Sequence, residues 1–373
     1  MYFNGRGEKK LNFILEFLYM MNLNLEISDD LIMKAYQEIL EIKDKEKSNI
    51  FISTLFTYLM MNKRNSELIT KLLKKSFEKD NFVPYCEKMN KKNKNPIILL
   101  AGSGKKGIKT INISTTSAIV ALSLGANIIK PCSMATSSMS GSFDFLNMVG
   151  VNTQLSIADT KKLFDKTRFG IFAIENLIPN FDSVYGDVFY APNILSYGLA
   201  ALICPIKPDI VLYGLANKDM EISGQVLRKY NVNRYRIVSS EINKIFFMDE
   251  LNVFGKSYVL DDNKSKKSVY KFQKILNLNK YNYDINSIKQ SSNKIDNINI
   301  ALNILKGDCN TAYSKVVALN AGNILQLSGI VNTIEEGYYK ALEKIKTGEC
   351  IHELEKIIIA SGGDINKLSK IKE

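Results

Sequence analysis

A glycine-rich turn between two apolar runs carries residues suited to binding an anion. In "LLAGSGKKGIKTINISTTSAIV", glycines allow backbone N–H groups to approach a ligand closely, and short hydroxyl and amide side chains stand just before an apolar helical stretch. The N-terminus of such a helix adds about half a positive charge. The turn matches neither a Walker A motif nor a GxGxxG motif, and an ordinary tight turn is the alternative explanation. The candidate ligand-contacting residues are Gly102, Ser103, Gly104, Lys105, Lys106, Gly107, Asn112, Ser114 and Thr115.

A second loop of the same character follows the next apolar run. That run, "ANIIKP", includes Lys130, and the sequence continues into "CSMATSSMSGSFDFL", which opens another helical stretch. In open α/β sheets, loops at the carboxyl ends of neighbouring parallel strands face one crevice. We therefore expect both loops to border one ligand site. The hydroxyl-bearing residues of the second loop are Ser133, Thr136, Ser137, Ser138, Ser140 and Ser142.

Two adjacent acids, Asp249 and Glu250, stand much later in the chain, after the apolar run "IFFM". Paired carboxylates beside a phosphate site indicate Mg²⁺, which takes oxygen ligands and shares phosphate oxygens. In isolation such a pair is more often a solvated turn, so the interpretation depends on the two loops described above.

Histidine and cysteine usage excludes several classes of site. The single histidine, His352, has no histidine partner, which argues against histidine-based zinc sites and against Ser-His or Cys-His nucleophilic catalysis. Five cysteines form no CxxC pair and are odd in number, which predicts reduced thiols and a cytoplasmic protein. The cysteines are Cys86, Cys132, Cys204, Cys309 and Cys350.

The elements that must position these residues alternate along most of the chain. Residues 1–90 read as a small helical domain, with Ser28 predicted as a helix N-cap, and the polar run "EKMNKKNKNP" marks a boundary. Beyond it, short apolar runs alternate with helical stretches, which predicts an α/β domain over 95–171 and 203–373 with a mostly parallel central sheet. The stretch of about 172–202 reads as helical without a strand and is expected to join the N-terminal helices. The segment 261–299 is polar and irregular, and we expect a mobile excursion there.

The charge of the chain favours polyanionic partners. The formal net charge is +12 over 373 residues, which suits a phosphorylated small molecule or nucleic acid. The lysines are scattered rather than laid along one helix face, so diffuse surface charge is favoured over a nucleic-acid stripe. No apolar run approaches the ~20 residues that span a bilayer, and no secretory signal pattern opens the chain.

The order of these motifs resembles the anthranilate phosphoribosyltransferase family, which are class III phosphoribosyltransferases with a nucleoside phosphorylase-like fold. That family carries GTGGDG, T-x-NIST, KHGNRxxSSxxGSAD, a late DE pair and LNAA. The corresponding stretches here are GSGKKG (102–107), TINIST (110–115), KPCSMATSSMSGSFD (130–144), MDEL (248–251) and LNAG (319–322).

The resemblance implies a phosphoribosyl pyrophosphate (PRPP) donor bound with Mg²⁺, an aromatic or heterocyclic acceptor that attacks C1 of the ribose, and a homodimer formed through the helical domain. It implies no acid–base residue. Ser114, Asp249 and Glu250 would hold the metal. The implied PRPP-binding residues are Gly102, Ser103, Gly104, Lys105, Lys106, Thr110, Asn112, Ser114, Thr115, Lys130, Ser133, Ser138 and Ser142.

Departures from the family pattern concentrate at the acceptor side. Pro131, Cys132, Ser133 and Met134 replace the family's His, Gly, Asn and Arg, while Lys106 replaces an Asp in the glycine-rich turn. The stretch "NLIPNFDSVYGDVFY" lacks the arginine that would pair with anthranilate's carboxylate. Each lost charge-assisted bond removes about 1.5–3 kcal/mol, so we expect an acceptor other than anthranilate. Nearby aromatic residues are interpreted as core in preference to an acceptor pocket: Phe181, Tyr185, Phe189, Tyr190 and Tyr197.

Two other functions remain open from the sequence. A nucleoside phosphorylase-like ribosyl transfer would use inorganic phosphate, and Lys105 and Lys106 could suit that arrangement. A non-catalytic relative would bind nucleic acid through its basic surface, with an affinity that falls steeply with salt. The second alternative leaves Asp249, Glu250 and the hydroxyl-rich loop without a purpose.

Overall fold

A computed structural model describes residues 12–91, 93–104, 107–133, 141–281 and 283–371. The chain divides into two compact units. The smaller unit comprises the described residues through Phe82 together with Ile178–Phe189 and Asn193–Leu195. The larger unit comprises Val83–Leu177, Tyr190–Pro192 and the described residues from Ser196 onward.

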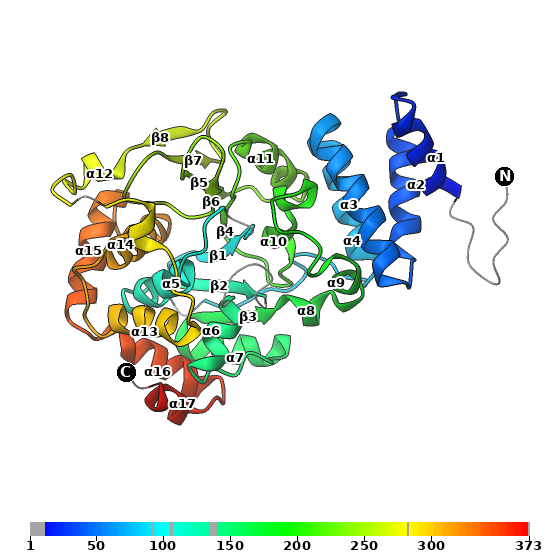
Figure 1. The fold of residues 1–373 in the computed structure, drawn as a ribbon. Helices are drawn as coiled ribbons and strands as arrows, with labels where there is room; N and C mark the ends of the chain where they lie inside the picture. The colour runs from blue at the N-terminus through cyan, green and yellow to red at the C-terminus, as the bar shows by residue number, and fades with distance from the viewer. Residues whose placement is uncertain (1–11, 92, 105–106, 134–140, 282, 372–373) are drawn as a thin grey trace. The chain divides into compact units, whose positions relative to one another are not determined.

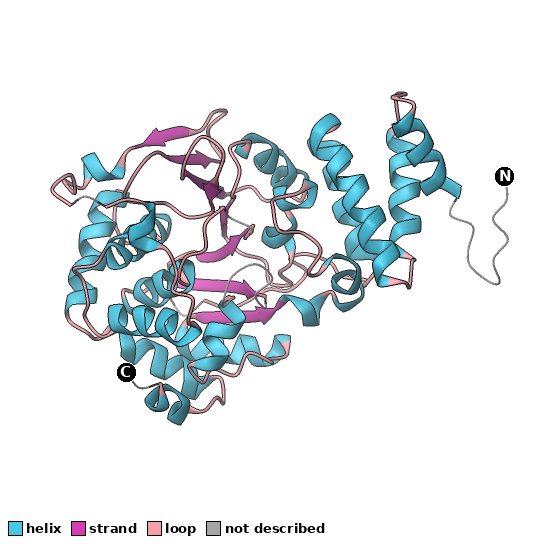
Figure 2. Cartoon of the chain, viewed as in Figure 1, coloured by secondary structure: helices cyan, strands magenta, loops and turns pink. Residues whose placement is uncertain are grey.

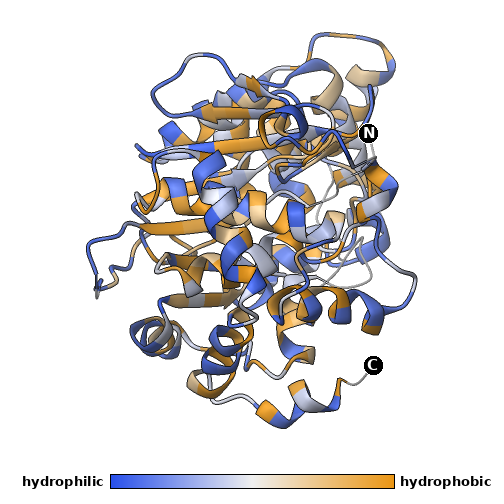
Figure 3. Ribbon diagram, turned by 90° about the vertical axis from the view of Figure 1, so that its left-hand side faces the viewer, coloured by the Kyte–Doolittle hydropathy of each residue, from blue (hydrophilic) through white to orange (hydrophobic). Residues whose placement is uncertain are grey.

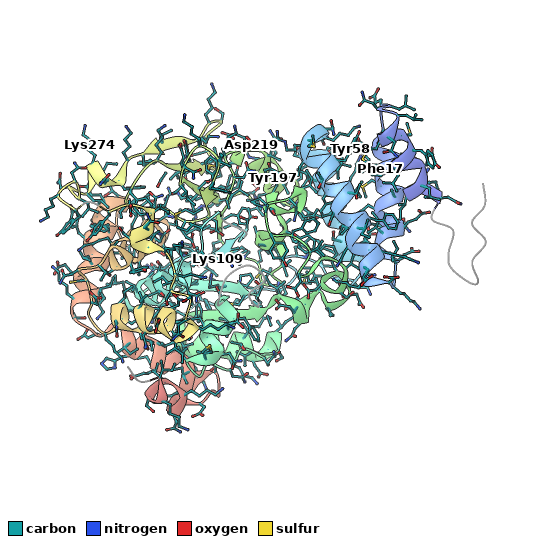
Figure 4. All side chains as sticks on the ribbon, in the orientation of Figure 1. Phe17, Tyr58, Lys109, Tyr197, Asp219 and Lys274 are labelled. Carbon is teal, nitrogen blue, oxygen red and sulfur yellow. The ribbon has the colours of Figure 1, made fainter. Side chains whose placement is uncertain are left out.

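The smaller unit is helical. Ser28 accepts a hydrogen bond from the Leu31 N–H at 3.2 Å and begins its helix, which confirms the predicted N-cap. Phe17 and Tyr58, labelled in Figure 4, pack edge to face with ring centroids 5.3 Å apart. The helices are α1 (Asn12–Asn22), α2 (Asp29–Leu40), α3 (Lys45–Asn62), α4 (Ser66–Glu78) and α9 (Pro179–Tyr185).

An aromatic cluster forms part of the core of this unit. Phe56 stacks on Phe189 at 5.3 Å, and Tyr185 packs against both Phe181 and Phe189. Phe181 is fully buried, as the core interpretation predicted. Tyr190 is 76% exposed, so that interpretation is wrong for this residue.

The larger unit is built on one sheet with the strand order β3-β2-β1-β4-β5-β7-β8, and β6 pairs with β5 (Figures 1 and 2). The pairs that join β3, β2, β1, β4 and β5 are parallel, whereas β6, β7 and β8 pair in antiparallel fashion. This confirms the predicted α/β class with a mostly parallel sheet. The strands are β1 (Ile97–Gly102), β2 (Asn127–Cys132), β3 (Phe169–Ala173), β4 (Ile210–Gly214), β5 (Tyr235–Glu241), β6 (Phe247–Met248), β7 (Ser257–Asp261) and β8 (Ser268–Tyr270).

The parallel strands are apolar because helices cover both faces of the sheet, and their ribbons are mostly orange in Figure 3. Among the covering helices, α14 crosses α15 very closely: a Cβ atom on Gly322 would lie 2.5 Å from the Tyr338 backbone nitrogen. The helices of this unit are α5 (Ile113–Ser123), α6 (Ser142–Met148), α7 (Ile157–Thr167), α8 (Ile174–Leu177), α10 (Leu199–Leu202), α11 (Met220–Lys229), α12 (Phe272–Ile275), α13 (Lys294–Leu305), α14 (Ala312–Leu327), α15 (Ile334–Lys346), α16 (Cys350–Ala360) and α17 (Ile365–Lys370); short 3₁₀ turns lie at Ile194–Tyr197 and Ile285–Ile288.

Two sequence predictions about this architecture are wrong. The stretch 172–202 was expected to contain no strand, but its first residues complete β3. The segment 261–299 is not an irregular excursion, because it contains β8, α12 and the start of α13. Phe272, Leu276 and Ile288 in that segment are buried and anchor it to the core. Within the described part of the chain, no helix combines the length and apolar character needed to cross a membrane.

Candidate active site

The loop after β1 is tied to the end of the neighbouring strand β4. The Ser103 N–H donates to the Gly214 carbonyl oxygen at 2.8 Å, and the Ser103 hydroxyl accepts from the Ala216 N–H at 2.9 Å. The backbone and the side chain of Ser103 thus join the ends of β1 and β4. The first predicted loop therefore starts at the edge of the sheet where open α/β sheets bind ligands.

The acid pair lies directly against this loop. The Gly104 N–H donates to Asp249 Oδ2 at 2.9 Å, and Gly104 has a left-handed φ of +60°. A Cβ atom on Gly102 would lie 2.6 Å from Asp249 Oδ2, and one on Gly214 would lie 1.9 Å from the Asp249 carbonyl oxygen. Asp249 and Glu250 are 9% and 6% exposed. Glycine at both strand ends is therefore what allows Asp249 to lie so close to β1 and β4.

Ser114, Asp249 and Glu250 line one cavity together with Gly102. Ser114 comes from the first turn of α5, Gly102 from the end of β1, and the acids from the segment after β6. Residues separated by more than a hundred positions in the sequence thus meet at one edge of the sheet.

Lys130 adds a cation next to this cavity. Its Nζ donates to Ser114 Oγ at 3.0 Å from within β2, and the residue is 3% exposed. The adjacent Thr115 hydroxyl donates to Ser142 Oγ at 3.1 Å, which joins the first turns of α5 and α6. The two hydroxyl-bearing helix starts predicted from the sequence are therefore neighbours.

The donor set around the cavity fits a hard divalent cation. Ser114, Asp249 and Glu250 offer hydroxyl and carboxylate oxygens, the ligand type that Mg²⁺ prefers. Among the residues that the structure describes, no group of three or more His, Cys, Asp or Glu side chains could hold a metal by itself.

Comparison with known proteins now gives the family. The model of the glycosyl transferase family, a/b domain, matches residues 94–351. The chain belongs to this family. The glycosyltransferase is 28% identical over 277 residues to an anthranilate phosphoribosyltransferase of Pseudoalteromonas translucida, covering 72% of this chain and 75% of that protein. It is 30% identical over 268 residues to the anthranilate phosphoribosyltransferase of Francisella philomiragia, covering 69% of this chain and 76% of that protein.

Solved structures agree on the fold. The anthranilate phosphoribosyltransferase of Thermus thermophilus superposes with a TM-score of 0.72 at 19% identity, covering 92% of this glycosyltransferase and 99% of that chain. The anthranilate phosphoribosyltransferase of Saccharomyces cerevisiae, solved in complex with PRPP and Mg, superposes with a TM-score of 0.75 at 18% identity. The match covers 95% of this chain and 99% of that chain. The predicted resemblance to the anthranilate phosphoribosyltransferase family is confirmed, and the chain is a glycosyltransferase enzyme.

Among the described residues, the other predicted site residues of the glycosyltransferase are not part of the cavity lining. Thr110 is buried, and its hydroxyl donates to the Ile111 carbonyl oxygen at 3.1 Å. The Asn112 carbonyl oxygen accepts the Thr116 N–H within α5. Ser133 is exposed just after β2, and Ser142 is the first residue of α6. Lys105, Lys106 and Ser138 lie outside the described residues, as do Met134, Thr136, Ser137 and Ser140.

Asn320 is a cavity residue to which the sequence argument gave no role. From α14, its Oδ1 accepts the Leu251 N–H at 3.0 Å, and its Nδ2 donates to the Leu251 carbonyl oxygen at 2.8 Å. This side chain therefore holds the backbone next to Glu250 from both sides. The available signal was a polar amide inside the apolar helical run "VVALNAGNIL".

A second amide, Asn323, lines the same cavity one turn further along α14. It accepts a hydrogen bond from Arg236 at 2.8 Å, and Arg236 also pairs with Asp261 at 2.6 Å. Cys132 contributes no reactive thiolate, because burial raises the pKa of its thiol to about 11.

Proposed function

We propose that this enzyme is a Mg²⁺-dependent phosphoribosyltransferase that moves ribose 5-phosphate from PRPP to an aromatic or heterocyclic acceptor other than anthranilate. The observation that carries the proposal is the shared cavity of Gly102, Ser114, Asp249 and Glu250. The yeast relative with PRPP and Mg bound supports the choice of donor and cation.

Ser114, Asp249 and Glu250 would hold the Mg²⁺, which neutralises charge on the departing pyrophosphate when it is bound. The chain's own residues bind and orient the donor. The first turn of α5 would receive the donor's phosphates at its N-terminus, and buried Lys130 lies beside it with its Nζ on Ser114. The remaining loop residues proposed for PRPP are Ser103, Gly104, Lys105, Lys106, Thr110, Asn112, Thr115, Ser133, Ser138 and Ser142.

The acceptor is proposed to lack the carboxylate of anthranilate. Pro131 and Cys132 stand where the family has His and Gly, and both are buried within β2. Ser133 and Met134 stand where the family has the amide and guanidinium donors. A neutral thiol and a proline offer an acceptor carboxylate no charge-assisted bond, because burial keeps the pKa of Cys132 near 11.

Isothermal titration calorimetry tests the donor and metal roles. Wild-type protein is expected to bind PRPP in the presence of Mg²⁺ and to lose that binding when EDTA is added. The double variant Asp249→Asn with Glu250→Gln keeps side-chain size and should abolish the Mg²⁺-dependent component. A matched control changes another adjacent acid pair, Asp29→Asn with Asp30→Asn at the start of α2, and should bind normally. Absence of binding to wild type at millimolar PRPP would overturn the proposal.

The acceptor is tested separately with a panel of aromatic and heterocyclic amines and phenols. Pyrophosphate release that depends on a compound without a carboxylate, and is absent with anthranilate, is the expected result. Turnover of anthranilate at a rate comparable to that of the best other acceptor would contradict the acceptor assignment and leave the donor assignment intact.

We also propose a cytoplasmic homodimer formed through the helical unit. Tyr19, Leu23 and Met61 are 68%, 66% and 77% exposed on that unit and are the apolar side chains that we propose the dimer covers. The five cysteines are free thiols, which supports a reducing compartment. Light scattering should give twice the chain mass, and the variant Tyr19→Lys with Leu23→Lys should give the monomer mass.

A further inference from the structure

A hairpin connects β5 to the acid pair and has a well-defined turn. The Ile242 N–H donates to the Phe246 carbonyl oxygen at 2.9 Å. Asn243 Oδ1 accepts from the N–H groups of both Ile245 and Phe246, each at 2.9 Å. Yet Ile245 is 78% exposed and Phe246 is 47% exposed, so neither side chain serves the core. The exposed ring of Phe246 needs another explanation.

Phe246 packs on the glycine-rich loop. A Cβ atom on Gly107 would lie 2.4 Å from Phe246 Cδ1, so the ring rests directly on the Gly107 backbone and leaves no room for a side chain. The Gly107 N–H also donates to the Phe247 carbonyl oxygen at 3.3 Å. Figure 4 labels Lys109, two residues beyond Gly107, which locates this part of the loop.

The same short segment holds the loop at a second point. Asp249, three residues after Phe246, accepts the Gly104 N–H at 2.9 Å. Residues 246–249 therefore contact both Gly104 and Gly107, the residues that precede and follow the Lys105–Lys106 pair in the sequence. Glycine-rich segments lose the most conformational freedom when they are ordered, so contacts that order one in advance favour ligand binding.

We propose that Phe246 is a positioning residue that holds Gly107, at the end of the glycine-rich loop, in the arrangement that binds the donor phosphates. The inference rests on the proposed function for the identity of the ligand. The ring acts on the loop backbone and does not act on the reacting atoms. Its exposure is then the consequence of covering a loop that has no side chain at the contact.

Phe246→Ala tests the proposal, with Ile245→Ala as the matched control from the same turn. If the loop of Phe246→Ala adopts the donor-binding arrangement in about a tenth of the molecules, the Kd and KM for PRPP rise about tenfold. The kcat should stay within about twofold of the wild-type value. Phe246→Tyr, which keeps the ring, should restore the wild-type KM. Ile245→Ala should match wild type throughout.

A readout without ligand separates this inference from the proposed function. With selective ¹⁵N-glycine labelling, amide exchange at Gly104 and Gly107 should accelerate in Phe246→Ala and remain unchanged in Ile245→Ala. Asn243→Ala removes both side-chain hydrogen bonds of the turn and should accelerate the same two amides, so the test survives if one variant folds poorly.

Unchanged exchange at both glycines in Phe246→Ala overturns the inference, as does an Ile245→Ala variant that behaves like Phe246→Ala. A wild type that fails to bind PRPP, combined with faster glycine exchange in Phe246→Ala, would reject the proposed ligand and retain the positioning role. Faster exchange with an unchanged KM would reject the role in donor binding.

Discussion

Gly214→Ala is the substitution for which the structure predicts the sharpest effect. Gly214 ends β4 and pairs in parallel register with Gly102, and both residues lie under Asp249. An alanine Cβ at Gly214 would lie 1.9 Å from the Asp249 carbonyl oxygen, a backbone atom that cannot rotate away. To restore an ordinary contact near 3.4 Å, the two segments must move apart by about 1.5 Å.

That displacement acts on the segment carrying both carboxylates. Misplacing catalytic groups by about 1 Å costs about 100-fold in rate, so we expect at least that loss in kcat/KM for PRPP. Overpacking at a buried site also costs about 1–3 kcal/mol of unfolding free energy. The protein should therefore remain folded at 25 °C while Mg²⁺-dependent donor binding is lost.

The assay is a Mg²⁺ titration of PRPP binding, with urea unfolding to check stability. Gly170→Ala is the matched control, because Gly170 is also a buried strand glycine but its Cβ would lie 3.3 Å from Thr160 Cγ2, a side-chain atom that can shift. It should bind PRPP normally. If Gly214→Ala bound PRPP within twofold of Gly170→Ala, the close approach of Asp249 to β4 could not be what organises the site.

Three further predictions follow from particular contacts. Asn320→Ala removes both hydrogen bonds to the Leu251 backbone beside the acid pair and should weaken the apparent Mg²⁺ affinity about tenfold. The measurement is PRPP binding as a function of Mg²⁺ concentration, and an unchanged midpoint would show that Asn320 does not hold the acid pair in place. Asp261→Ala leaves buried Arg236 without its carboxylate partner and should lower the unfolding free energy by about 3 kcal/mol in urea, whereas a shift below about 0.5 kcal/mol would show that the amide partners suffice. At pH 8, about one Cys132 thiol in a thousand is ionised because burial raises its pKa to about 11, so mass spectrometry should find it alkylated far more slowly than exposed Cys86; equal rates would contradict that burial.

The sequence predicted the central strands because their boundaries are chemically marked. "IILLAG" ends in glycine and "DIVLYG" does the same, and both are strands in the structure. β3 lacked such marks: it follows Arg168, a non-glycine residue in the left-handed conformation with φ of 63°, and runs directly into a helix. The prediction for 261–299 was wrong because the buried residues of this segment are single apolar residues among polar ones. They show neither the helical nor the strand periodicity that identifies an element from sequence.

The meeting of Ser114 with Asp249 and Glu250 was predictable for a topological reason. Parallel strands deliver their carboxyl ends to one edge, which places the loop after β1 there. The acid pair reaches the same edge because β6, directly before it, pairs antiparallel with the last residues of β5. The role of Asn320 was not predictable, because its partners are backbone atoms of Leu251, 69 residues away in the chain. The contact between Phe246 and Gly107 escaped prediction for the same reason, since an exposed phenylalanine has no sequence signature.

A crystal structure with PRPP and Mn²⁺ tests most directly whether one ion is bound between the acid pair and the first turn of α5. Mn²⁺ accepts the same oxygen ligands as Mg²⁺ and gives an anomalous signal. The account predicts an anomalous peak within coordination distance of Asp249 or Glu250, next to Ser114, with pyrophosphate oxygens completing the ion's shell. A donor bound with its metal on a different set of residues would contradict the account.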